Sequence, residues 1–168
     1  MRPSVSPVIF GPVAETLGAE EADFYAQAQP FGFILFKRNC VNRGQLKRLV
    51  DDLRSCVGWH CPILIDQEGG RVARMQAPEW QAHPSAGRAG SLMQSDPVQG
   101  LKFIQHTLTN LSTELLEMGI DVNCLPVLDV LRPGITDNAI GDRAYGDNPE
   151  LVIACGELAV WTLLALDM

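Results

Sequence analysis

Short apolar segments alternate with amphipathic helical patterns along the chain, and this alternation constrains the fold more than any other feature. The expected strands are residues 8–10, 31–36, 62–66 and 120–125. The expected helices are residues 19–28, the segment between Asn42 and Gly58, the segment between Asp96 and Gly119, and a last helix that begins at Asn148 and Pro149. Strands that alternate with helices form parallel sheets. The sequence therefore predicts an α/β protein with four βα units.

Two connections are too long to be simple links, and both follow the carboxyl end of an expected strand. They are residues 67–95 and 126–148, and long loops in compact domains are usually functional. Barrel enzymes build their sites from such loops, and a complete (β/α)8 barrel (TIM barrel) takes about 250 residues. Gly11, after the first strand, lacks the further glycines of a dinucleotide-binding loop. We therefore expect about half of a (β/α)8 barrel, without an internal domain boundary.

Composition excludes several classes of partner. The 168 residues carry 13 basic and 20 acidic side chains, a net charge of −7, which repels nucleic-acid phosphates and anionic membrane surfaces. Residues 151–166 contain Glu157 and fall short of the ~20 apolar residues of a membrane span. Residues 1–6 do not resemble a secretory signal. We expect a cytoplasmic protein with no nucleic-acid or membrane partner.

The cysteines and histidines predict no metal site. No two cysteines form a C-x-x-C pair, and none is placed at metal-ligand spacing with a histidine. We expect reduced, buried thiols and no metal or organic cofactor. The five cysteines are Cys40, Cys56, Cys61, Cys124 and Cys155.

The sharpest local pattern is residues 65–74, which read I-D-Q-E-G-G-R-V-A-R at the end of the third strand. Asp66 and Glu68 place two carboxylates there, and Arg71 and Arg74 add two positive charges close to them. The glycine pair between them allows a sharp turn or a close approach to a ligand. Such a group of donors and acceptors can orient a polyhydroxylated ligand. It can equally be an ion-pair cluster that ties down a loop, and chemistry alone leaves both readings open.

A second pattern lies in the loop after the fourth strand, where residues 140–146 read I-G-D-R-A-Y-G. If both strands belong to one parallel sheet, this loop lies on the same face as the first. Arg143 can then direct its planar, multi-donor guanidinium group at the same ligand. The alternative is that Asp142 and Arg143 are surface residues of a turn.

Four blocks together resemble bacterial β-N-acetylhexosaminidases of glycoside hydrolase family 3. They are residues 32–39 (G-F-I-L-F-K-R-N), 65–72 (I-D-Q-E-G-G-R-V), 126–130 (P-V-L-D-V) and 141–146 (G-D-R-A-Y-G). The resemblance extends from about residue 7 to about residue 160. It implies that residues 1–168 are the amino-terminal half of a (β/α)8 barrel domain. It also implies a cytoplasmic hydrolase that cleaves terminal β-linked N-acetylglucosamine from muropeptide-derived fragments during cell-wall recycling.

The resemblance assigns substrate-binding roles to three residues of this chain. Asp66 accepts hydrogen bonds from sugar hydroxyls, and Arg74 and Arg143 donate to the same sugar. The family uses a retaining mechanism with an aspartate nucleophile and a histidine acid/base. Those two residues, and a Lys-His pair that completes sugar binding, belong to later parts of the barrel. No catalytic residue is therefore assigned in this chain.

Other polar residues are weaker candidates for chemistry. His60 precedes a strand and His106 lies in a helix, so we expect both to be structural. His83 lies in the long loop after the third strand and is interpreted as a loop residue. Asp129 follows the fourth strand, at a position that is structural in the family, and is not assigned as the nucleophile.

Two other functions remain open, and the half-barrel has a physical consequence. The chain can be a non-catalytic sugar-binding remnant, or a family 3 relative that acts as a β-glucosidase. In either case residues 8–10 and 120–125 would be unpaired edge strands, and the last helix is apolar around most of its circumference. We therefore expect the chain to self-associate.

Overall fold

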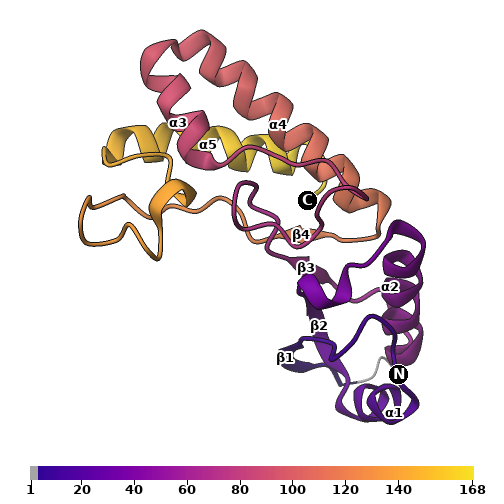
Figure 1. Ribbon diagram of the computed structural model, residues 1–168. Coiled ribbons are helices and arrows are strands. Elements are labelled where there is room, and N and C mark those ends of the chain that lie inside the picture. The colour runs from indigo at the N-terminus through magenta and orange to yellow at the C-terminus, as the bar shows by residue number, and fades with distance from the viewer. Residues whose placement is uncertain (1–3) are drawn as a thin grey trace.

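The computed structural model describes residues 4–168 and has the predicted alternation of strands and helices (Figure 1). Its four strands form one parallel sheet in the order β1-β2-β3-β4. The strands are β1 (Ser6–Phe10), β2 (Pro30–Leu35), β3 (Ile63–Ile65) and β4 (Val122–Asn123). The helices are α1 (Ala19–Ala28), α2 (Arg43–Val57), α3 (Ala86–Ser95), α4 (Pro97–Glu117) and α5 (Pro149–Leu164), with short 3-10 turns η1 (Lys37–Asn39) and η2 (Gly141–Arg143). The α/β class and the parallel sheet are confirmed.

Helix α3 corrects the expectation of a continuous loop over residues 67–95. This segment lacks a long apolar stripe, so its periodicity carries no strong helical signal. Small residues instead let α3 lie very close to the loop before α5. A Cβ atom at Gly90 would come within 1.6 Å of the Tyr145 carbonyl oxygen. Tertiary packing, which periodicity does not report, therefore stabilises this helix.

Strand β4 is shorter than the predicted strand over residues 120–125. Hydrogen bonds to β3 run from the amide of Asp121, which donates to the Ile63 carbonyl, to the amide of Cys124, which donates to Ile65. The amide of Leu125 then turns back to the Asn123 carbonyl at 2.7 Å. Pro126 follows and has no N–H to donate. The ladder therefore ends at Cys124, one residue before the predicted end of the strand.

Helix α2 has the predicted caps. The Asn42 side chain accepts a hydrogen bond from the Gln45 amide at 2.9 Å, and the Gln45 side chain accepts one from the Asn42 amide. Gly58 ends the helix in the left-handed region, at φ 76°. Leucine and valine side chains of α2 then pack against the sheet.

Removal of the α2 cap should lower stability measurably. We expect Asn42→Ala to reduce the free energy of unfolding by about 1 kcal/mol, because the Gln45 amide loses its acceptor. Asn42→Asp keeps an acceptor and should change stability little. Urea unfolding of the two variants checks this, and an equal loss in both would contradict the capping explanation.

The two faces of the sheet have different environments. Phe33, Leu35, Ile63 and Ile65 point to one face, where α1, α2 and α4 bury them completely. Strand register places Ile9 beside Gly32, Ile34 beside Leu64, and Leu64 beside Val122 on the opposite face. We call this second set the inner face. Ile9 and Val122 on it are exposed, and Ile34 and Leu64 are only partly buried.

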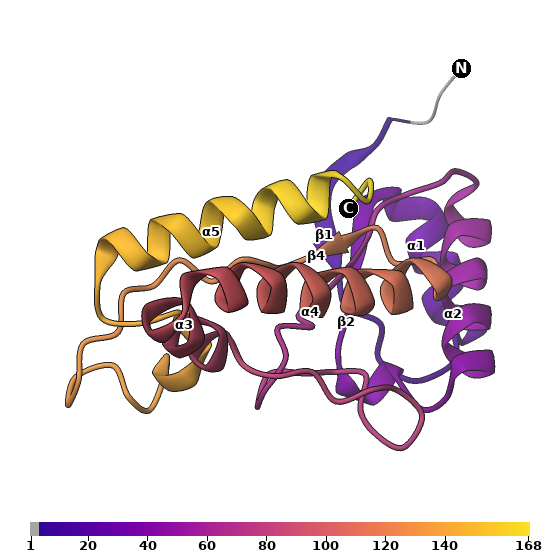
Figure 2. The ribbon, with the colours of Figure 1, turned by 90° about the horizontal axis from the view of Figure 1, so that it is seen from above.

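Helices α3, α4 and α5 pack around a second core, and Figure 2 shows α5 running alongside α4. Val152, Cys155 and Ala159 bury one side of α5. The other side carries exposed apolar side chains, including Trp161 at 71% exposure. The apolar character of α5 on more than one side is therefore confirmed. No helix in residues 4–168 has the length and apolarity needed to cross a bilayer.

The cysteines are all free thiols, but the expectation that all are buried was wrong. Cys61 and Cys155 are buried, whereas Cys124 is exposed. The reason is its position, because it directly follows β4 at the end of the sheet where the long loops begin.

Candidate functional site

The loops after β3 and β4 meet at the carboxyl end of the sheet, as the parallel topology predicts. Arg143 of η2 forms two hydrogen bonds with Glu68, which follows β3. Arg74 forms an ion pair with Asp66. The three predicted substrate-binding residues therefore lie in one region, but they do not form a single contact group. Asp66 binds Arg74, while Arg143 binds Glu68.

Asp66 is the first residue after β3, and its carboxylate faces Arg74. The Nη2 atom of Arg74 donates to Oδ2 of Asp66 at 2.7 Å. Both side chains are about three-quarters buried. This contact leaves Oδ1 of Asp66 as an acceptor that is not engaged by Arg74. A sugar hydroxyl can donate to such an oxygen.

Arg143 is held on two sides. Its Nε and Nη2 atoms donate to the two carboxylate oxygens of Glu68, each at 2.8 Å, and Nη1 donates to the Ala139 carbonyl at 3.2 Å. The hydrogen bond with Glu68 raises the pKa of Arg143 further, with smaller contributions from the nearby charges of Asp129 and Asp66. The guanidinium group therefore stays charged and keeps one orientation.

A buried amide network, which the sequence patterns did not reveal, fixes the start of the β3 loop. The Gln67 side chain donates to the Met75 carbonyl and accepts from the amides of Arg74 and Met75. Asn123 of β4 exchanges two hydrogen bonds with the Gln67 backbone. The available signal was the two-residue period of the strand, which places Gln67 on the same buried face as Ile63 and Ile65. The network aligns the ends of the two strands that carry the site.

The glycine pair permits a close approach, but the approaching group is the protein's own loop. Gly69 and Gly70 have φ values of 89° and 56°. The Gly70 amide donates to the His83 carbonyl at 2.8 Å, and a Cβ atom at Gly69 would lie 2.3 Å from the Pro84 carbonyl oxygen. These glycines therefore hold residues 83–85 against the site and do not themselves cradle a ligand.

The alternative of a loop-tying ion pair applies to Arg71. Its Nε atom donates to Asp142 at 3.1 Å, and its Nη2 atom donates to the carbonyls of Ala139 and Ile140. Both charged side chains are nearly half exposed. Arg71 therefore joins the two long loops at the surface, and it shares the Ala139 carbonyl with Arg143.

The histidines have the structural placements that were expected. The side chain of His83 is buried, and its Nε2 atom lies 3.2 Å from Glu114 of α4. His60 is exposed beside the amino end of β3, and His106 is exposed on α4. Within residues 4–168 no cluster of three or more His, Cys, Asp or Glu side chains is arranged to hold a metal ion.

Cys124 is a neighbour of Asp66 that sequence reasoning did not place in this region. Desolvation by the surrounding protein, followed by the interaction with Asp66, raises the pKa of the thiol to about 11. The thiol is therefore protonated at neutral pH. A protonated thiol is a poor nucleophile, so Cys124 is not a candidate nucleophile.

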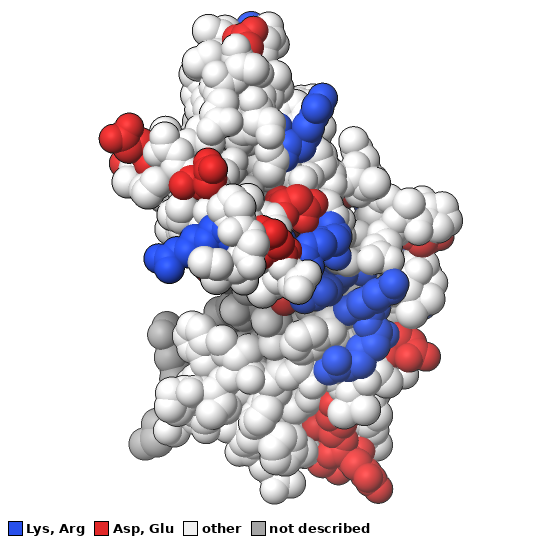
Figure 3. All heavy atoms as spheres, turned by 60° about the vertical axis from the view of Figure 1, so that its left-hand side comes forward, with Lys and Arg blue, Asp and Glu red and all other residues white. Residues whose placement is uncertain are grey.

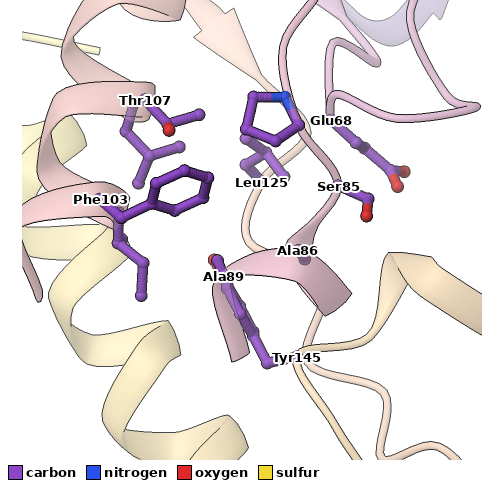
Figure 4. Close-up of a pocket in the computed structure, with 11 residues that line it drawn as sticks. Glu68, Ser85, Ala86, Ala89, Phe103, Thr107, Leu125 and Tyr145 are labelled. Atoms are coloured by element: carbon purple, nitrogen blue, oxygen red, sulfur yellow. The ribbon is translucent and has the colours of Figure 1, made fainter. Parts of the chain in front are cut away.

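A small cavity lies beside Glu68 and is lined mostly by apolar side chains (Figure 4). Its lining includes Phe103, Leu125 and Tyr145. The volume of about 30 Å³ is suited to a single water molecule and not to a sugar ring.

Carboxylates outnumber guanidinium groups at the site by three to two. The carboxylates of Asp66, Glu68 and Asp129 lie near the guanidinium groups of Arg74 and Arg143. Acidic and basic side chains adjoin one another in the middle of the face shown in Figure 3. Without an excess of positive charge, the site favours a neutral hydroxylated ligand over a phosphate.

Comparison with known proteins identifies bacterial β-hexosaminidases as relatives of this chain. Relatives include a β-hexosaminidase of Xylella fastidiosa, 32% identical over 96% of this chain and 47% of the relative. A β-hexosaminidase of Photobacterium profundum is 34% identical over 89% of this chain and 42% of the relative. The chain thus spans about half the length of the curated relatives that it matches.

Solved structures also match this chain over about half of their own length. NagZ from Neisseria gonorrhoeae, in complex with N-trifluoroacetyl-D-glucosamine, superposes with a TM-score of 0.86 and 29% identity. The match covers 94% of this chain and 47% of that protein. It confirms a partial TIM barrel as the fold. Residues 12–165 also match the model of the glycosyl hydrolase family 3 N-terminal domain. The chain therefore belongs to glycoside hydrolase family 3.

Proposed function

We propose that this chain is the sugar-binding half of a β-N-acetylhexosaminidase, which cleaves terminal β-linked N-acetylglucosamine. One observation carries the proposal. The Asp66–Arg74 pair and Arg143 lie at the carboxyl ends of adjacent parallel strands, where barrel enzymes bind their substrates. The likeness to β-hexosaminidases and to a NagZ structure that holds an N-acylated glucosamine analogue supports this substrate class.

The donors and acceptors match a neutral sugar. Each sugar hydroxyl can donate one hydrogen bond and accept others. Asp66 supplies an acceptor, while Arg74 and Arg143 supply donors that remain charged at every physiological pH. The site has no excess of positive charge and therefore adds no preference for an anion. Fragments of recycled cell wall in the cytoplasm are the substrates that we propose.

The reaction that we propose is hydrolysis with retention, in which an aspartate attacks the anomeric carbon and a histidine acts as acid/base. Both groups would lie outside these 168 residues. Asp66 and Glu68 already bind guanidinium groups, which draws electron density from their oxygens. Asp66 is therefore suited to accepting hydrogen bonds from the sugar and Glu68 to holding Arg143, and neither is suited to attacking the sugar.

The test is a titration of the 168-residue chain, labelled with nitrogen-15, with N-acetylglucosamine followed by NMR. We expect Asp66→Ala and Arg143→Ala each to weaken binding by roughly 10- to 150-fold, because each removes a charge-assisted hydrogen bond worth about 1.5–3 kcal/mol. Both side chains lie on loops, so the fold should be kept, but Arg143→Ala leaves the carboxylate of Glu68, which is 7% exposed, without its partner and should lower the melting temperature.

Glu117→Ala provides the matched control. Its carboxylate forms an exposed ion pair with Arg43 between α4 and α2, away from the β3 and β4 loops, so affinity should not change. Unchanged affinity in both Asp66→Ala and Arg143→Ala would remove these residues from the site. A parallel titration with glucose separates a β-glucosidase relative, which would bind glucose at least as well.

A further inference from the structure

We propose that Glu68 is a positioning residue, which orients Arg143 so that its unused N–H groups face the sugar. This inference rests on the proposed function, because it assumes that Arg143 donates to the substrate. Glu68 itself is not available to a ligand. Its side chain is 7% exposed, whereas that of Arg143 is 28% exposed.

The Glu68–Arg143 contact is bidentate. Nε and Nη2 of Arg143 each donate to a different oxygen of Glu68 at 2.8 Å. Two parallel hydrogen bonds fix the plane and the rotation of a guanidinium group, which a single bond does not do. The carboxylate therefore determines the direction of the opposite edge of the group.

A count of donors shows what remains for a ligand. A guanidinium group has five N–H donors. Glu68 uses two of them, and the Ala139 carbonyl uses one through Nη1. Nη1 and Nη2 each retain one donor. The free donor of Nη2 lies at the end of the guanidinium group opposite Nε, so the bidentate contact with Glu68 fixes its direction.

Glu68 is a more rigid partner than the loop that carries Arg143. Its amide donates to the Val72 carbonyl at 2.9 Å, and the preceding residue, Gln67, is locked by the buried amide network. Arg143 lies in η2, within the long connection between β4 and α5. The ion pair therefore fixes the position of Arg143, on the β4 loop, relative to the end of β3.

A second ion pair joins the same two loops. Its removal tests whether Glu68 positions Arg143 or only tethers the loop that carries it. Arg71 binds Asp142, which is the neighbour of Arg143 in the sequence, and both side chains are nearly half exposed. The Asp142 carboxylate is paired with Arg71 and not with Arg143. Asp142→Asn therefore removes the charge of this second ion pair, and we expect it to leave the Glu68–Arg143 contact unchanged.

The experiment compares Glu68→Gln with Asp142→Asn in the 168-residue chain, with N-acetylglucosamine as the probe. We expect Glu68→Gln to weaken binding roughly tenfold, because a charged bidentate contact is lost. The Nε–H resonance of Arg143 should shift and broaden. Asp142→Asn should change affinity less than about twofold and leave that resonance in place.

Two further variants keep the test decisive. Glu68→Asp retains the charge but withdraws it by one methylene group, so it should also lower affinity and shift the Nε–H resonance, even if Glu68→Gln fails to fold. In the Arg143→Ala background, Glu68→Gln should cause no additional loss of affinity, because the two residues act as one unit.

The outcomes separate this inference from the proposed function. Equal losses of affinity in Glu68→Gln and Asp142→Asn would show that Glu68 only tethers the loop and would overturn the inference. Unchanged affinity in Glu68→Gln, together with lost affinity in Arg143→Ala, would also overturn it but would leave the proposed function intact. Unchanged affinity in Arg143→Ala and Asp66→Ala would instead reject the proposed function.

Discussion

Gly90→Ala is expected to lower the free energy of unfolding by about 3 kcal/mol, at the upper end of the usual cost of overpacking. The new Cβ atom would lie 1.6 Å from the carbonyl oxygen of Tyr145 and 2.6 Å from its carbonyl carbon. Backbone atoms cannot move aside as a flexible side chain can. Since a whole domain is stable by only about 5–15 kcal/mol, this loss should be readily visible in urea unfolding.

Gly90→Ala should also disturb the candidate site. Tyr145 is two residues from Arg143, so a displaced Tyr145 backbone moves η2 and weakens the contact with Glu68. We expect reduced affinity for N-acetylglucosamine as well as reduced stability. Gly44→Ala is the control, because the nearest atoms to its added Cβ lie 3.6 Å away. A small gain or no change is expected there, since alanine favours a helix over glycine. Equal stability of the two variants would contradict the packing argument.

The second large effect concerns association, since residues 1–168 expressed alone are expected to form dimers or larger species. β1 and β4 are the edges of the sheet, and unpaired edges accept a strand from another chain. The inner face adds the exposed side chains of Ile9 and Val122. On α5, exposed apolar residues border a groove that also contains Leu128 and Val130.

A second copy is the occupant that we expect on these surfaces. Each copy offers β1 at one edge and β4 at the other, with all strands parallel. In a twofold arrangement, β4 of each copy can pair with β1 of its partner, which doubles four strands to the eight of a closed barrel. Such closure buries the inner faces of both copies against each other.

Light scattering at several concentrations measures this association. Trp161→Glu, which places a charge on the exposed side of α5, should shift the mass toward that of a single chain. Ile135→Glu is the matched control, because Ile135 is also highly exposed but lies in the loop before η2. A wild-type chain that stays monomeric at all concentrations would contradict the prediction. An unchanged mass in Trp161→Glu would place the interface elsewhere, and equal dissociation in both variants would show an effect of added charge that is not specific to α5.

Much of the architecture follows from local patterns. The period of apolar residues predicted the strands and most helices, because burial imposes that period on each element separately. Asn42 and Gly58 marked the ends of α2, since capping depends on residues close in sequence. The charged residues after β3 predicted a polar site at the sheet end, because Asp66 and Arg74 are only eight positions apart.

Contacts between distant segments were not visible in this way. Helix α3 depends on the fit of Gly90 against Tyr145, and the alignment of β3 with β4 depends on the buried pair Gln67 and Asn123. The partner of Arg143 is Glu68, 75 positions away. Sequence patterns show which side chains can pair, but the choice among several nearby carboxylates depends on distances of a few ångströms. Those distances arise only when the loops after β3 and β4 are packed together, which is why the folded chain, and not its sequence, selects Glu68.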